Sequence, residues 1–278
     1  MKFGVFQLNV KMNMKNLLFF IAIFISTKAF GVEFQGKFIQ GHFIIGKTEP
    51  ETKIWIDKQK VRVTEDGFFA FGIGRDRKYD LVITLEKDDK KQKIVKKVQK
   101  REYKIQRIDG LPEKKVTPPK EVYERIKSEN KIIADARSID SDLKFFKNKF
   151  MNPLDNAIVT GVYGSQRILN GKPKWPHYGI DFAAKEGTKI KAMLDGTATM
   201  VEPDLFYTGG TLIFDHGHGI STLYMHMQKI YVKKGEIVKQ GDIIGTVGST
   251  GRSTGAHLDV RLNWFGTRLD PATVLKVK

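Results

Sequence analysis

The sequence of 278 residues contains no cysteine. This absence excludes a disulfide framework, a cysteine-ligated zinc finger, an iron–sulfur cluster and a thiol nucleophile. Any metal ion must therefore be bound by histidine, aspartate or glutamate. The sequence also lacks an Arg-rich block or a recognition-helix motif, which argues against nucleic acid as a partner.

Charge of one sign is in excess. Lys and Arg total 48 against 31 Asp and Glu, which gives a formal net charge of +17, while hydrophobic residues make up 41%. The apolar content is that of a globular protein, and the length allows two domains. The positive excess suggests either an acidic polymer, such as a cell-wall glycan, or a lysine-rich solvated surface. Lysine is densest between Lys87 and Lys100.

The N-terminus has the pattern of an export signal. An apolar run covers residues 17–25, Lys11 and Lys15 precede it, and Ala29-Phe30-Gly31 follows as a small-residue cleavage site. The run is shorter than the ~20 residues that a membrane span needs. The pattern predicts a signal peptide over residues 1–31 and a periplasmic or extracellular protein, with an uncleaved membrane anchor as the alternative.

Three segments follow the signal. Residues 32–109 contain short β-rich runs separated by turn residues, which predict a small β-sandwich-like domain. Residues 110–150 combine a Pro-rich linker with apolar residues at helical spacing. Residues 151–278 return to β-rich runs and hold five of the six histidines. We therefore expect a mainly β protein with two domains joined by a helical linker.

Histidine and aspartate recur at spacings that suit a metal site. His177 and Asp181 are four residues apart, and His257 and Asp259 are two apart. On β-strands both spacings place the side chains on one face. With His226 as a third histidine, such strands can build a zinc site that keeps an open coordination position.

Residues 151–278 resemble the M23 family of zinc metallopeptidases, the lysostaphin-like peptidoglycan hydrolases. The similarity rests on matching stretches in the family's order, which include Gly161-Val-Tyr-Gly164, His177-Tyr-Gly-Ile-Asp181, Asp215-His-Gly217, Tyr224-Met-His226, residues 238–245, and residues 248–257 ending in His257. The resemblance implies an antiparallel β metallopeptidase domain with a groove across its sheet, and Zn²⁺ as the cofactor.

The resemblance also implies residue roles. His177 and Asp181 match two zinc ligands, and His226 and His257 match the histidines that orient or deprotonate the metal-bound water. The third ligand of the family is the second histidine of a His-x-His motif, where this sequence has Asp259. Aspartate is a chemically suitable zinc ligand. Arg261, two residues further on, either neutralises the added charge or holds Asp259 in a salt bridge instead.

Two functions follow from this resemblance. The first is an exported zinc endopeptidase that hydrolyses peptide cross-links or stem peptides of peptidoglycan. The second is a catalytically silent scaffold that binds the cell wall or activates another wall hydrolase. We expect a monomer, with another wall hydrolase or a divisome-type complex as its possible protein partner. We also expect a peptidase domain that folds from about residue 150 onward without the segments before it.

Several other residues near these motifs have candidate roles. Tyr163, Arg167 and Tyr224 are candidate substrate contacts in the groove. His216 and His218 are expected to be structural. The Gly/Ser/Thr loop of residues 248–255, which contains Arg252, is expected to form a wall of the groove.

Overall fold

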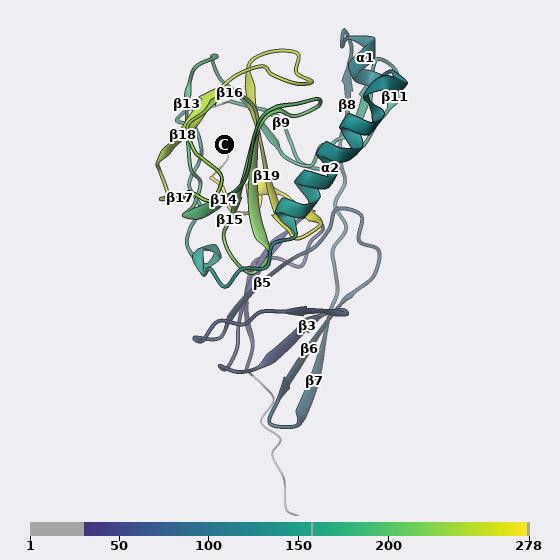
Figure 1. The fold of residues 1–278 in the computed structure, drawn as a ribbon. Helices are drawn as coiled ribbons and strands as arrows, with labels where there is room; N and C mark the ends of the chain where they lie inside the picture. Colours follow the sequence, from purple (N-terminus) through teal and green to yellow (C-terminus); the bar gives the residue numbers. More distant parts are fainter. Residues whose placement is uncertain (1–30, 157, 277–278) are drawn as a thin grey trace, which may run out of the picture.

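The computed structural model describes residues 31–156 and 158–276 (Figure 1). The predicted signal peptide lies, apart from Gly31, outside the described residues. The fold is mainly β and its sheets are predominantly antiparallel, as the sequence predicts. Within the described ranges, no helix combines the length and apolar character needed to cross a membrane.

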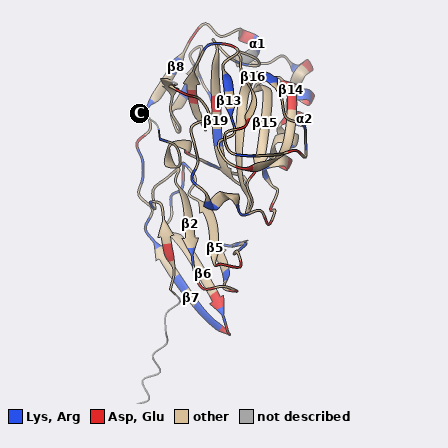
Figure 2. Ribbon diagram, turned by 90° about the vertical axis from the view of Figure 1, so that its left-hand side faces the viewer, with Lys and Arg blue, Asp and Glu red and all other residues tan. Residues whose placement is uncertain are grey.

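Two small antiparallel sheets form the N-terminal domain, with strand orders β1-β2-β5 and β4-β3-β6-β7. The outer strand β7 carries lysines, which Figure 2 shows as a blue band along its length, and Lys90, Lys91 and Lys93 are exposed. The strands are β1 (Glu33–Gln35), β2 (Phe43–Lys47), β3 (Lys53–Ile56), β4 (Gln59–Val61), β5 (Phe68–Gly72), β6 (Leu81–Lys87) and β7 (Lys90–Lys96).

The C-terminal domain is built on a ten-stranded sheet whose central order is β17-β14-β15-β16-β19-β12-β9. A small second sheet has the order β11-β10-β8. The strands are β9 (Ile158–Gly161), β10 (Gln166–Leu169), β11 (Lys172–Pro173), β12 (Ile180–Ala183), β13 (Lys189–Lys191), β14 (Gly196–Leu205), β15 (Gly209–Asp215), β16 (Ile220–Ile230), β17 (Ile237–Val238), β18 (Ile243–Val247), β19 (His257–Trp264) and β20 (Thr267–Leu269).

The segment between the two domains is attached to the C-terminal domain along its length. Strand β8 (Ile105–Ile108) pairs in parallel with β10, and Leu111 and Val116 pack with Leu169. Helix α2 packs against β14 and β15 (Figure 1). The helices are α1 (Glu113–Val116), α2 (Tyr123–Arg137) and the 3₁₀ turns Lys120–Val122, Phe145–Lys147 and Pro271–Thr273.

The two domains share one hydrophobic core. Phe71 of β5 lies 6.5 Å from Trp264 of β19 between ring centroids, and both side chains are buried. Gly72 lies so close to Leu269 that a Cβ atom at this position would overlap the leucine side chain. The interface is thus packed like a protein interior, which disfavours the expectation of a peptidase domain that is independent of the preceding segments.

A chain that begins at residue 150 is predicted to be less stable than the full chain. It would lose the partners of Trp264, Leu269 and Leu169, and each buried apolar side chain contributes about 1.5–3 kcal/mol. Urea unfolding of the two chains measures the difference. Equal free energies of unfolding would contradict the shared core.

Phe71→Ala tests the same interface in the full chain. The substitution is expected to cost about 3–5 kcal/mol, as for other buried phenylalanines. It should also increase hydrogen exchange in β19 and β20, on the other side of the interface. Increased exchange confined to the N-terminal domain would indicate two separate cores.

Candidate metal centre

The register between β12 and β19 places two carboxylates opposite each other. Asp181 pairs with Asp259 in this antiparallel ladder, so both side chains point to the same face of the sheet. The alternate residues of the two strands, which include Ile180 and Val260, point into the core on the other face. This alternation confirms that His257, Asp259 and Arg261 share one face of β19.

His177 reaches the carboxylates from outside the strand. The spacing of His177 and Asp181 predicts that both lie on one strand, but β12 begins at Ile180. The backbone of His177 is instead held by Gly164 and Ser165, through hydrogen bonds of 2.7 and 2.8 Å. The intervening Gly179 permits this approach, because a Cβ atom there would overlap Asp259.

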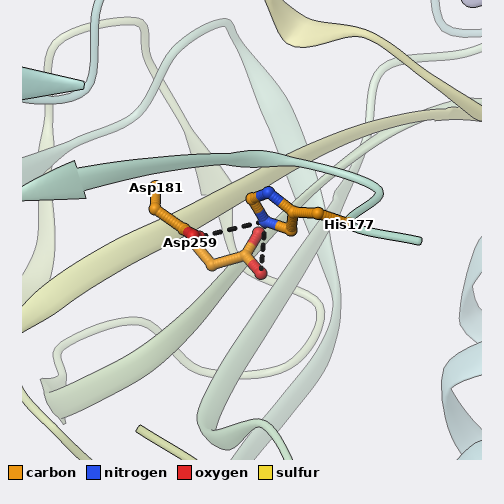
Figure 3. Close-up of side chains that lie close together, drawn as sticks. All are labelled: His177, Asp181 and Asp259. Carbon is orange, nitrogen blue, oxygen red and sulfur yellow. Dashed lines mark hydrogen bonds and ion pairs between the residues drawn. The ribbon is translucent and has the colours of Figure 1, made fainter. Parts of the chain in front are cut away.

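The three side chains converge on a single point (Figure 3). His177 Nε2 lies 3.0 Å from Asp181 Oδ1 and 3.3 Å from Asp259 Oδ2. One ligand atom from each residue lies within 4.8 Å of the others, and all three residues are buried.

Two arginines hold the same carboxylates. Arg167 Nη2 donates to Asp181 Oδ2 at 2.8 Å, and Arg261 Nη2 donates to Asp259 Oδ2 at 3.0 Å. Arg261 Nε approaches Asp259 Oδ1 at 3.3 Å. Asp259 and Arg261 as a pair carry no net charge. The pair therefore has the same charge as a neutral histidine, the residue that the His-x-His motif has in place of Asp259.

The ionisation of the three residues is coupled. Burial alone would raise the pKa of Asp259, but Arg261 and His177 outweigh it and hold that pKa well below its usual value. Burial lowers the pKa of His177, but Asp259 and Asp181 outweigh it and raise the pKa overall. A proton on His177 therefore competes with a metal ion for this site, as expected for an imidazole ligand.

The residues present fit a divalent metal ion. One histidine and two carboxylates are a donor set that zinc accepts. Asp181 Oδ1 is buried, and the polar atom that faces it at the point of convergence is Nε2 of His177, 3.0 Å away, whose contact falls short of a well-aligned hydrogen bond. The guanidinium groups of Arg167 and Arg261 bind Asp181 and Asp259 and would fix the orientation of these carboxylates towards a metal ion.

His226 reaches the site through a change in strand phase. Met225 contacts the apolar cluster on the site face, whereas Met227 points into the core on the opposite face. His226 between them has a φ of 62°, and this left-handed residue shifts the alternation so that its ring also faces the site. Such backbone strain is often found at functional residues.

His226 and His257 form a pair beside His177, Asp181 and Asp259. The ring centroids of His226 and His257 are 4.6 Å apart. Nδ1 of His226 donates to the carbonyl of Thr250, and Nδ1 of His257 donates to that of Gly255, each at 2.8 Å. This leaves Nε2 of each ring to exchange a proton. Burial, followed by His257, lowers the pKa of His226 to about 4, so its imidazole is neutral at pH 7.

Both histidines line a cavity of about 300 Å³ together with Asp181. One wall is the loop that contains Arg252, as the sequence analysis expected. The other wall comes from the segment before the domain and includes Gln106, Ile108 and Leu111. Sequence reasoning missed this second wall, because parallel strand pairing between β8 and β10 leaves no local signal.

Two of the predicted substrate contacts are corrected by the structure. Tyr224 is fully buried and its hydroxyl accepts a hydrogen bond from the backbone of Met193. Tyr163 is 2% exposed and its hydroxyl donates to the carbonyl of Arg268. Both tyrosines therefore stabilise the core. Arg167 does line the cavity, but its guanidinium is bound to Asp181.

His216 lies outside the metal centre and has the structural contacts expected of it. It is fully buried, with Nδ1 at 2.6 Å from the carbonyl of Asp195 and Nε2 at 2.8 Å from the hydroxyl of Thr222. Burial lowers its pKa to about 4. A neutral ring satisfies both partners by donating from Nδ1 and accepting at Nε2.

The pKa of His216 predicts a pH-dependent stability. Its folded-state pKa lies below the unfolded value near 6.5, so the unfolded chain binds the proton more readily. The contribution is complete above pH ~6.5 and is lost as the pH falls towards ~4, with a size on the order of 3 kcal/mol. Urea unfolding from pH 7 to 4 measures the slope, which His216→Gln should reduce. An unchanged slope would contradict the assignment.

The fold and this cluster of ligands define a metallopeptidase-type domain, and comparison with known proteins gives the family. Residues 175–271 match the model of Peptidase family M23. The C-terminal domain of this chain is therefore an M23 peptidase domain.

Curated relatives share this part of the chain. The peptidoglycan DD-endopeptidase ShyC of Vibrio cholerae is 36% identical over 138 residues, which are 49% of this chain and 31% of ShyC. The DD-carboxypeptidase/endopeptidase Mpg of Neisseria meningitidis is 40% identical over 98 residues, which are 35% of this chain and 22% of Mpg. The matches thus span between about a fifth and a third of these relatives' length.

A solved structure shares the fold over most of the chain. A protein of Pseudomonas aeruginosa that is assigned to peptidase family M23 superposes with a TM-score of 0.67 and 24% identity. The similarity covers 86% of this chain and 95% of that chain. At this identity the comparison supports the fold alone.

The structure predicts distinct metal affinities for variants of Asp259. If Asp259 is a ligand, Asp259→Ala removes a donor and should weaken Zn²⁺ binding by at least about tenfold, whereas Asp259→His supplies a nitrogen donor and should retain it. Arg261→Ala should still bind Zn²⁺, with a smaller loss of affinity than Asp259→Ala. Calorimetric titration with Zn²⁺ measures all three. Equal affinity of Asp259→Ala and the unaltered protein would show that Asp259 serves only the salt bridge.

Proposed function

We propose that this chain is an exported, zinc-dependent endopeptidase that hydrolyses peptide bonds of peptidoglycan. The observation that carries the proposal is the convergence of His177, Asp181 and Asp259 beside the His226–His257 pair in an M23 domain. The choice of peptidoglycan is supported by the names of the relatives ShyC and Mpg. The choice of an exported, periplasmic or extracellular protein rests on residues 1–31, and we propose a monomer.

His177, Asp181 and Asp259 would hold the metal ion. A bound Zn²⁺ supplies Lewis acidity towards water and a peptide carbonyl. The chain's own residues supply the proton transfer. Nε2 of either His226 or His257 accepts a proton from the attacking water, and Nε2 of the other donates to the oxygen on which negative charge develops. The carbonyls of Thr250 and Gly255 fix the ring orientations needed for both tasks.

The experiment is the digestion of purified peptidoglycan, with mass spectrometry of the released peptides. The full chain with Zn²⁺ should release fragments with new peptide termini, and a chelator should abolish the release. His226→Ala should retain Zn²⁺ and reduce turnover by about 10²–10⁴-fold, because it removes a proton-transfer group. His42→Ala, in the N-terminal domain, is the matched control and should remain active.

A second function, a silent wall-binding scaffold, is favoured by one observation. Arg167 and Arg261 pair with Asp181 and Asp259, so the carboxylates are neutralised without a metal ion. A protein that binds peptidoglycan but neither takes up Zn²⁺ nor releases peptides would have this second function. Release of peptides that persists in His226→Ala and with chelator would contradict both functions.

A further inference from the structure

Helix α2 covers part of the sheet face that carries the metal centre. Ala136 of α2 belongs to the same apolar cluster as Leu223 and Met225 of β16. Leu223 and Met225 pair across the ladder with Arg261 and Asp259. The last residue of the helix, Arg137, is therefore brought to the face of β19 beside the metal centre, where only 9% of it is exposed.

Three arginines come together at this place. Arg268 of β20 pairs with Asn263, which lies on the same face of β19 as Arg261. Nε of Arg137 and Nε of Arg268 are both buried and have no hydrogen-bond partner within the described part of the chain. Buried donors of this kind are rare in folded proteins and call for a ligand or ordered water.

The charges of this cluster are not balanced. Burial, followed by Arg268 and Arg261, lowers the pKa of Arg137 to about 10, which leaves it cationic at neutral pH. Asp259 is the carboxylate bound to the cluster, and it is shared between Arg261 and His177. The ring of Tyr178, 4.9 Å from the guanidinium carbon of Arg268, gives partial compensation. The carbonyl dipoles at the end of α2 attract Arg137 only weakly.

We propose that Arg137, Arg261 and Arg268 form a subsite that binds a carboxylate of the peptide substrate next to the metal centre. The planar, forked guanidinium matches a carboxylate in two-point hydrogen bonding. The identity of the ligand rests on the proposed function, whereas the anion site itself rests on the cluster.

The position of the subsite limits which carboxylate it can bind. Arg261 is two residues from Asp259, a separation of about 6.6 Å along the strand. An extended peptide advances about 3.3–3.6 Å per residue. The bound carboxylate therefore belongs to a residue within about two positions of the cleaved bond, as a chain terminus or a side chain.

The test is thermal unfolding of the full chain with a chelator present, so that the metal centre cannot bind the probe. The probes are a short peptide with a free C-terminal carboxylate and the same peptide as its amide, at equal ionic strength in chloride. The free carboxylate should raise the melting temperature and the amide should not. Without peptide, Arg137→Gln should itself raise the melting temperature, because it removes a buried, unpaired cation.

Matched variants decide whether the rise belongs to the subsite. Arg137→Gln should abolish it, whereas Lys131→Gln, which removes an exposed charge from the same helix, should retain it. Arg268→Lys keeps the positive charge but loses the forked guanidinium group, so it should reduce the rise in melting temperature. The same variant tests the subsite if Arg137→Gln does not fold. A rise that persists in Arg137→Gln and Arg268→Lys, or no rise in the unaltered protein, would overturn the subsite.

Cleavage kinetics separate the subsite from the proposed function. The unaltered enzyme should have a higher kcat/KM for the substrate with the free carboxylate than for its amide. In Arg137→Gln the ratio of these two kcat/KM values should fall by about 10- to 100-fold. If neither substrate is cleaved, the proposed function fails, and the melting experiment still decides the anion site. If acetate raises the melting temperature through Arg137 as strongly as the peptide does, the assignment to a substrate carboxylate is overturned.

Discussion

Two carboxylates face each other across one rung of the β12–β19 ladder, and the functional face is organised around this repulsive pair. Like charges directly opposite on a sheet are destabilising. Asp181 and Asp259 are nevertheless buried, because His177 lies between them and Arg167 and Arg261 hold their outer oxygens. Arg167 and His177 come from segments outside this ladder, so the carboxylate pair also ties those segments to the sheet. A metal ion held by these three residues would exclude a proton from Nε2 of His177.

Asp259 changes the chemistry of the centre relative to the family motif but not its charge. The added carboxylate is matched by Arg261 on the same strand face. Salt bridge and metal ligation, which the sequence presents as alternatives, are compatible in the structure because a carboxylate has two oxygens with several acceptor positions. This compatibility makes the enzymatic function the better supported one. The positive charge of the four guanidinium groups near the centre, from Arg137, Arg167, Arg261 and Arg268, opposes the binding of a cation there.

Much of the fold can be predicted from the sequence, as can part of the grouping of the histidine and aspartate side chains, because strand alternation is a local property. The i, i+2 spacing of His257 and Asp259 predicts their common face correctly. The same rule fails at His226, where a left-handed residue shifts the phase, and at His177, which lies before its strand. The sequence offers Tyr163 and Tyr224 as candidate groove contacts, but in the structure backbone partners satisfy their hydroxyls in the core. The wall formed by β8 and the approach of Arg137 depend on long-range packing, which the local pattern does not encode.

The lysines of β7 have a consequence for how molecules of this protein behave towards each other. As the outer strand of its sheet, β7 exposes one row of backbone donors and acceptors, which is a template for pairing with a strand of another molecule. Lys90, Lys91 and Lys93 place charge along that edge, and two molecules that tried to pair there would bring these charges together. The positive excess of the N-terminal domain thus protects an open sheet edge from aggregation.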